Sequence, residues 1–134
     1  MGGSVVGAIE RGVLVLLGVA PSDDDATAEA LARRIVELRI HQDDAGQTNL
    51  ALRDVGGAVL AVSQFTLYAD TRRGRRPGFT GAARPEHAAA VYERFCAALE
   101  ELGVRTARGR FGAPMEVELV NQGPFTIWLD TSER

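Results

Sequence analysis

The sequence is poor in the residues that metal sites and many hydrolases use. Its 134 residues include one cysteine, Cys96, and two histidines, His41 and His87. No HExxH or HxxxH pattern is present, so we expect no metal and no cofactor. Cys96 follows Phe95 on the apolar side of a predicted helix, which favours a buried inert thiol over a nucleophile. A lone cysteine forms no internal disulfide and fits a reducing compartment.

Long apolar runs are also absent. The longest, Val13 to Leu17, is much shorter than the roughly 18 residues of a membrane span, so no membrane partner is expected. The Met1 end lacks the pattern of a secretory signal, and this predicts a cytoplasmic protein. The formal net charge of -3 argues against a protein that coats nucleic acid without specificity, but a local basic patch is compatible with it.

The length and composition predict a single folded domain over residues 1–134, with 46% hydrophobic and 25% charged residues. Strand patterns outnumber helix patterns, which predicts a mixed α/β fold: two helices packed on a β-barrel-like or strongly bent mixed sheet. Because Gly12–Val19 is apolar on both faces, we expect it to be central. The predicted strands are Val5–Glu10, Gly12–Val19, Asn49–Leu52, Ala58–Gln64, Thr106–Phe111, Met115–Val120 and Phe125–Leu129; the helices run from a Ser22 cap to about Ile40 and from Pro85 to Gly103.

The segment SQFTLYAD, from Ser63 to Asp70, ends an apolar strand in hydroxyl and amide groups. A strand end with small polar residues can present backbone N–H groups outward. Such donors stabilise an oxyanion without an acid or base. An ordinary strand exit is an equally good reading of this segment alone.

The segment TRRGRRPGF holds four arginines between turn-forming residues: Arg72, Arg73, Arg75 and Arg76. Guanidinium groups bind phosphate bidentately, so the loop predicts a phosphate or nucleic-acid contact. A substrate such as tRNA is favoured, because the acidic remainder of the chain would repel a long duplex. A solvated loop without a ligand is the alternative.

The segment NQGPFTIWLD has a strand-like alternation that is interrupted by Gly123-Pro124. Proline lacks an N–H for a strand ladder, and glycine reaches backbone angles that other residues avoid, so the pair indicates a forced turn or an edge. Together, SQFTL and NQGPFT resemble the SQxxL and NxGPxT motifs of the D-aminoacyl-tRNA deacylases. GVLVLLGV, RPGF and GRFGAPM add to the resemblance, which extends from about Val5 to Leu129.

The resemblance implies a homodimeric cytosolic enzyme that hydrolyses the ester joining a D-amino acid to tRNA, or glycine mischarged on tRNA-Ala. Backbone groups of Gln64, Phe65 and Thr66 would stabilise the oxyanion, and the 2′-hydroxyl of the terminal ribose would assist. Thr66 as a covalent nucleophile is disfavoured, because no base stands beside it in the sequence.

The resemblance also implies how the substrate is held. A cis Gly123-Pro124 peptide would enter the partner subunit's pocket, where main-chain carbonyls hold the α-amino group and exclude L-amino acids by collision. The substrate-binding set would be Ser63, Asn121, Gly123 and Pro124, with Phe111 and Met115 near the adenine. For Phe111 and Met115, packing in the core is the alternative.

The chain departs from the family pattern in two places. Family members begin with a strand containing a Gln-Arg-Val segment, and here Met1-Gly2-Gly3 stands where that strand has ended, so we expect this strand to be missing. Phe125 occupies a position where valine is usual. These departures leave a second function open, a non-catalytic tRNA- or RNA-binding module. A relative that edits another mischarged tRNA is disfavoured, because Ser63-Gln64 is intact.

Overall fold

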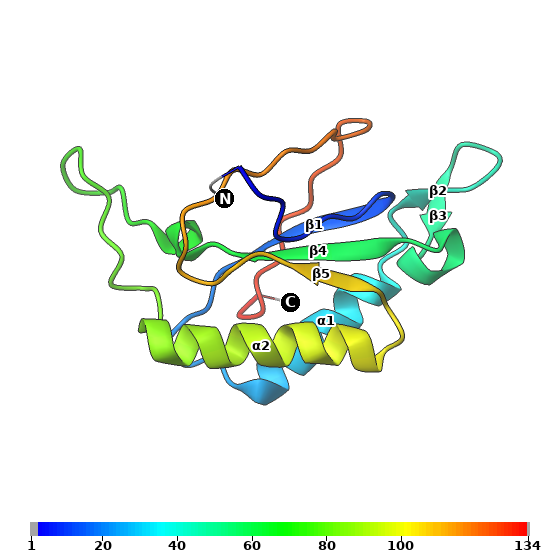
Figure 1. The fold of residues 1–134 in the computed structure, drawn as a ribbon. Helices are drawn as coiled ribbons and strands as arrows, with labels where there is room; N and C mark the ends of the chain where they lie inside the picture. Colours follow the sequence, from blue (N-terminus) through cyan, green and yellow to red (C-terminus); the bar gives the residue numbers. More distant parts are fainter. Residues whose placement is uncertain (1–2, 134) are drawn as a thin grey trace.

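The chain folds as a mixed α/β protein with two long helices (Figure 1), as the sequence predicts. The computed structural model describes residues 3–133. No helix in this range is long and apolar enough to cross a bilayer. The elements are β1 (Gly12–Leu17), α1 (Asp25–Glu37), β2 (His41–Gln42), β3 (Thr48–Leu50), the 3-10 helix η1 (Leu52–Val55), β4 (Ala58–Ser63), the 3-10 helix η2 (Phe65–Tyr68), α2 (Pro85–Glu101) and β5 (Thr106–Arg108).

The main sheet has three parallel strands in the order β1-β4-β5. The central strand is therefore β4, and the prediction that Gly12–Val19 is central was wrong. β4 is covered on both faces: Val59 and Ala61 are buried on one face, and Ala58 and Val62 on the other, as is typical of a central parallel strand. β2 and β3 form a separate antiparallel pair, and within residues 3–133 the strands do not close into a barrel.

Both helices pack on one side of the main sheet (Figure 1). Val91, Phe95 and Leu99 recur at helical spacing along α2 and are buried against the sheet and α1. Tyr92 is buried beside them and donates its hydroxyl to the Ala61 carbonyl oxygen at 2.7 Å. Burial raises the pKa of this hydroxyl. α2 is thus bonded directly to β4, the strand that leads into the SQFTL segment.

The first helix begins and ends at other residues than the sequence predicts. Its N-cap is Asp24, not Ser22: the Asp24 carboxylate accepts a hydrogen bond from the Thr27 backbone N–H at 2.9 Å. The Thr27 side chain accepts in turn from the Asp24 backbone N–H, which completes a capping box. The helix ends at Glu37, before the predicted Ile40. Asp24 takes the N-cap position in place of Ser22 because its carboxylate and Thr27 bond to each other's backbone N–H groups.

Three predicted strands do not form. Val5–Glu10, Met115–Val120 and Phe125–Leu129 carry no strand ladder. The first two lie on the side of the sheet away from the helices, whereas the third passes the sheet toward the helix side, where Leu129 packs against the core (Figure 1). Their alternation is real, but in the described residues no strand lies alongside to pair with them. Val5, Val120 and Trp128 are consequently 83%, 91% and 66% exposed. The expectation that the family's N-terminal strand is missing concerns the segment at Met1-Gly2-Gly3. Met1 and Gly2 lie outside the described residues.

Other strand boundaries shift by a few residues. The strand predicted at Thr106–Phe111 ends at Arg108, Ala58–Gln64 ends at Ser63, and Asn49–Leu52 becomes Thr48–Leu50 followed by η1. The N-terminal segment crosses β5 at close range: a Cβ on Gly7 would lie 2.4 Å from the Arg108 carbonyl oxygen. Glycine is therefore required at this crossing.

Candidate active site

The SQFTL segment forms a tight turn at the carboxyl end of β4. The Gln64 backbone N–H donates to the Leu17 carbonyl oxygen at 2.7 Å, which ties the turn to β1. η2 then begins at Phe65, and the first N–H groups of such a helix have no partner within it. Among the described residues, the Phe65 and Thr66 N–H groups find no acceptor elsewhere. Two consecutive free donors at a strand end can stabilise an oxyanion.

The side chains of this turn are bonded to one another. The Gln64 side-chain amide donates to the Thr66 hydroxyl oxygen. No carboxylate or imidazole of residues 3–133 is hydrogen-bonded to that hydroxyl, so no general base activates it within the described chain. Ser63 is the last residue of β4 and is half-buried. The chemistry available here is that of backbone donors.

The NQGPFT segment forms an exposed turn in which the Gly123-Pro124 peptide bond is cis. The Asn121 side-chain oxygen accepts from the Phe125 N–H at 2.9 Å. Its amide nitrogen donates to the Thr126 hydroxyl oxygen at 3.0 Å. Both polar ends of the Asn121 side chain are thus used across the turn, so this residue holds the shape of the Gly123-Pro124 loop.

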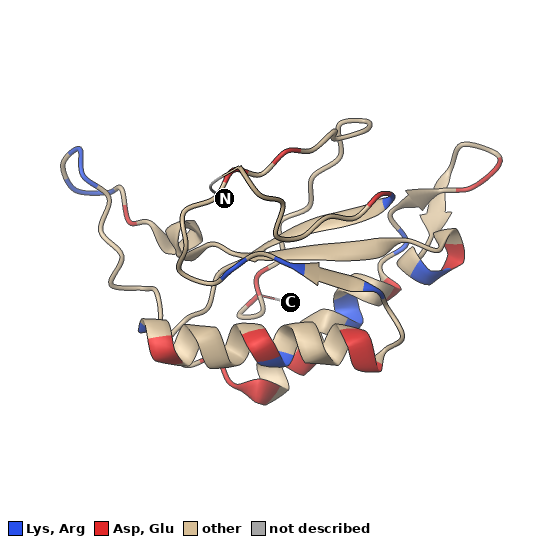
Figure 2. Cartoon of the chain, viewed as in Figure 1, with Lys and Arg blue, Asp and Glu red and all other residues tan. Residues whose placement is uncertain are grey.

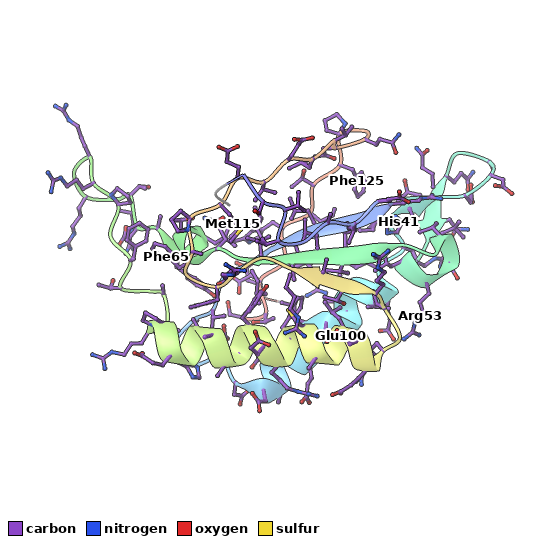
Figure 3. The ribbon with its side chains drawn as sticks, viewed as in Figure 1. His41, Arg53, Phe65, Glu100, Met115 and Phe125 are labelled. Atoms are coloured by element: carbon purple, nitrogen blue, oxygen red, sulfur yellow. The ribbon has the colours of Figure 1, made fainter. Side chains whose placement is uncertain are left out.

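The structure does not bring the two turns together within one chain. Figure 1 places the η2 turn and the 121–126 turn at opposite ends of the sheet face that lies away from the helices. Phe65 and Phe125, labelled in Figure 3, are correspondingly far apart, and Met115 lies between them. A site that uses both turns therefore needs more than one copy of the chain.

Phe111 and Met115 occupy different environments. The Phe111 ring lies 6.1 Å from the Tyr92 ring and is partly buried against the core, so packing accounts for much of its contact. A Cβ on Gly109 would lie 3.0 Å from the Met115 sulfur and 3.7 Å from Val62 of β4. Met115 is thereby held over the carboxyl end of the sheet, on the side of the Phe65 turn.

The arginine loop is closed at its base by a backbone bridge between Asp70 and Gly78, with N···O distances of 2.7 and 2.9 Å. Arg72 donates two hydrogen bonds to the Asp70 carboxylate at 2.9 and 2.8 Å, and these bonds hold the pKa of Asp70 well below its usual range. The other three arginines of the loop are exposed and have no partner among the described residues. These three are Arg73, Arg75 and Arg76. Figure 2 shows the arginines of this loop, in blue, at the tip of a projecting segment.

One residue of this region was missed by the sequence interpretation. The Phe79 ring lies 4.9 Å from the Phe65 ring at an interplanar angle of 64°, an edge-to-face contact. It connects the base of the arginine loop to the SQFTL turn. The only sequence signal for it is a phenylalanine next to loop-forming Pro77-Gly78.

No cluster of three potential metal ligands occurs in residues 3–133.

Comparison with known proteins identifies the class of enzyme to which this chain belongs. A family model described as D-Tyr-tRNA(Tyr) deacylase matches residues 1–130. The chain belongs to this family, as SQFTL and NQGPFT indicate. The predicted assignment to a D-aminoacyl-tRNA deacylase, a hydrolase acting on aminoacyl-tRNA, is confirmed at the level of the family.

Similar proteins cover nearly the whole chain. A D-aminoacyl-tRNA deacylase of Desulfatibacillum aliphaticivorans is 56% identical over 129 residues, which are 96% of this chain and 88% of the relative. One from Thermus aquaticus is 54% identical over 134 residues, 100% of this chain and 88% of the relative. A solved structure titled c-Myc DNA Unwinding Element Binding Protein superposes with a TM-score of 0.88 at 36% identity, covering 96% of this chain and 88% of the other.

Proposed function

We propose that this chain removes D-amino acids from tRNA in the cytoplasm, together with glycine mischarged on tRNA-Ala. The observation that carries the proposal is the pair of unpaired N–H groups on Phe65 and Thr66, at a strand end of a chain that belongs to the deacylase family. The ester of an aminoacyl-tRNA is already activated, so hydrolysis needs oxyanion stabilisation more than a strong base. Each donor of this kind contributes on the order of 3 kcal/mol to the transition state.

The proposed reaction is water-mediated hydrolysis. Water adds to the ester carbonyl, and the Phe65 and Thr66 N–H groups receive the negative charge on the carbonyl oxygen. The bond from the carbonyl carbon to the ribose oxygen then breaks to release the free amino acid. The proton lost by the attacking water passes through the neighbouring 2′-hydroxyl to the ribose oxygen, which leaves as a hydroxyl. The Gln64 N–H takes no part, because it is bonded to Leu17.

Selection between enantiomers is assigned to the Gly123-Pro124 turn of a second subunit. The turn lies far from Phe65 in its own chain, is exposed, and is held in shape by Asn121. Its main-chain carbonyls would bind the substrate's α-amino group, so the side chain of an L-amino acid would collide with the turn. Exposed Val120, Phe125 and Trp128 beside the turn support a homodimer that covers them.

Release of amino acid from three substrates tests this function directly. Incubated with D-Tyr-tRNA, L-Tyr-tRNA and Gly-tRNA-Ala, the purified chain is expected to hydrolyse the first and the third. Rejection of the L-ester by steric collision should exceed about 100-fold, because a clash costs several kcal/mol. Binding of all three without release would instead support the tRNA-binding module.

Sedimentation of the same sample should give the mass of a dimer.

Changing Thr66 to alanine distinguishes backbone catalysis from a covalent mechanism. The T66A variant keeps the backbone N–H and loses the hydroxyl that accepts from Gln64, together with the γ-methyl group. We expect kcat on D-Tyr-tRNA to fall less than about tenfold, since the oxyanion donors remain. Complete loss of turnover with normal tRNA binding would show that the hydroxyl is the nucleophile. A T66S variant, which retains a hydroxyl, is the control.

A further inference from the structure

An exposed aromatic pair lies between the SQFTL turn and the arginine loop. Phe65 is 54% exposed, although it makes an edge-to-face contact with the half-buried Phe79. Leaving so much of an aromatic side chain in water forfeits the gain from burying it. The pair therefore offers an apolar face that a ligand can cover.

The position of the pair relates it to the substrate. Phe65 provides one of the two proposed oxyanion donors through its own N–H. Phe79 directly follows Gly78, which closes the arginine loop by its bridge to Asp70. Along the protein surface the order is thus reacting ester, aromatic pair, free arginines.

The acceptor end of tRNA presents its groups in the same order. Counted from the 3′ end, the terminal adenosine with its ester comes first, the unpaired nucleotides come next, and the phosphates of the paired stem lie beyond them. Unpaired bases bind by stacking on aromatic side chains next to a basic surface, and this arrangement tolerates any base.

We propose that Phe65 and Phe79 form a stacking platform for the unpaired base adjacent to the terminal adenosine of the tRNA. The proposal rests on the proposed deacylase function and adds a subsite to it. It identifies Phe79 as a binding residue that acts on the RNA rather than on the amino acid. A different role for Phe79, bracing the Phe65 turn, would not depend on any base of the tRNA.

A double-mutant cycle between protein and RNA separates these roles. The protein variants are F79A, F79L, which keeps apolar bulk without a ring, and F79Y, which keeps the ring. The RNA substrates are D-Tyr-tRNA and the same molecule with an abasic site at the nucleotide adjacent to the terminal adenosine. A D-Tyr-tRNA with an abasic site inside the paired stem is the control.

On intact D-Tyr-tRNA, F79A is expected to lower kcat/KM about tenfold through a higher KM, the size expected of one lost stacking contact. F79L should lose nearly as much, and F79Y should stay near wild type. With the abasic nucleotide next to the adenosine, wild type and F79A should differ by less than about threefold, because the base that stacks is gone. The control RNA should restore the full difference.

An equal loss by F79A on the intact and the abasic substrate overturns the proposal and assigns Phe79 to bracing. So does a loss confined to kcat. Should F79A fail to fold by circular dichroism, F79L against F79Y carries the same cycle. Wild-type hydrolysis of intact D-Tyr-tRNA is measured first: if it is absent, the deacylase function itself fails, whereas uncharged tRNA binding in the same cycle still reports the stacking.

Discussion

Changing Gly123 to alanine is expected to lower kcat/KM for D-Tyr-tRNA about 100-fold, since a shift of about 1 Å in a positioning group can cost that much. Gly123 has a φ of 123°, which L-residues rarely adopt. A Cβ there would lie 3.1 Å from the Phe125 nitrogen and 3.3 Å from the Phe125 Cβ. The turn must move to accept it, and the main-chain carbonyls proposed to hold the α-amino group move with it.

Gly46 provides the matched control. It also has a positive φ, 79°, but an added Cβ would meet nothing within 4 Å, and it lies in the turn after Asp43. G46A and G123A each add a side chain at a left-handed position, which costs roughly 1 to 2 kcal/mol of stability. Thermal unfolding should therefore report destabilisation of both variants, greater for G123A because its Cβ also meets Phe125, and only G123A should lose hydrolysis. Equal activity in the two variants would contradict a role for the 121–126 turn.

Local sequence patterns correctly predicted the elements that pair or pack with another element of the same chain. The apolar run Ala58–Gln64 became the buried strand β4, and Pro85 began α2 as expected from its missing N–H and fixed φ. The alternation in Met115–Val120 and Phe125–Leu129 predicted strands, and neither segment forms one. A ladder needs a neighbouring strand, and whether one is present is not encoded in the alternation of the segment itself.

The same distinction applies to the site. The SQFTL strand exit and the arginine loop are visible as local patterns, and the structure retains both. Which donors are free depends on distant partners: the Gln64 N–H is bonded to Leu17, more than forty positions earlier in the chain. The Asp70–Arg72 pair is local and could have been read from its spacing, whereas the Phe65–Phe79 contact requires the loop to fold back.

The arginines proposed to bind phosphate are not equivalent in the structure. Arg72 is paired with the Asp70 carboxylate, whose hydrogen bonds and charge raise the pKa of the guanidinium, so a tRNA phosphate would have to compete with that carboxylate. Arg73, Arg75 and Arg76 have no such competitor among the described residues. The four arginines that the sequence groups together are thus divided by the structure into one that is paired with Asp70 and three that have no partner among the described residues.

Replacing Arg73, Arg75 and Arg76 together by alanine is expected to weaken tRNA binding about 100-fold at low salt and to reduce the slope of log K against log salt by about 2 to 3, one unit for each phosphate contact. Kd measured across a salt series checks both values. The control R33A/R34A/R105A removes the same charge from α1 and from the residue before β5. It should change the slope by less than about one unit, since it removes no phosphate contact. Equal slopes in the two triple variants would mean that net charge, and not the loop, attracts the tRNA.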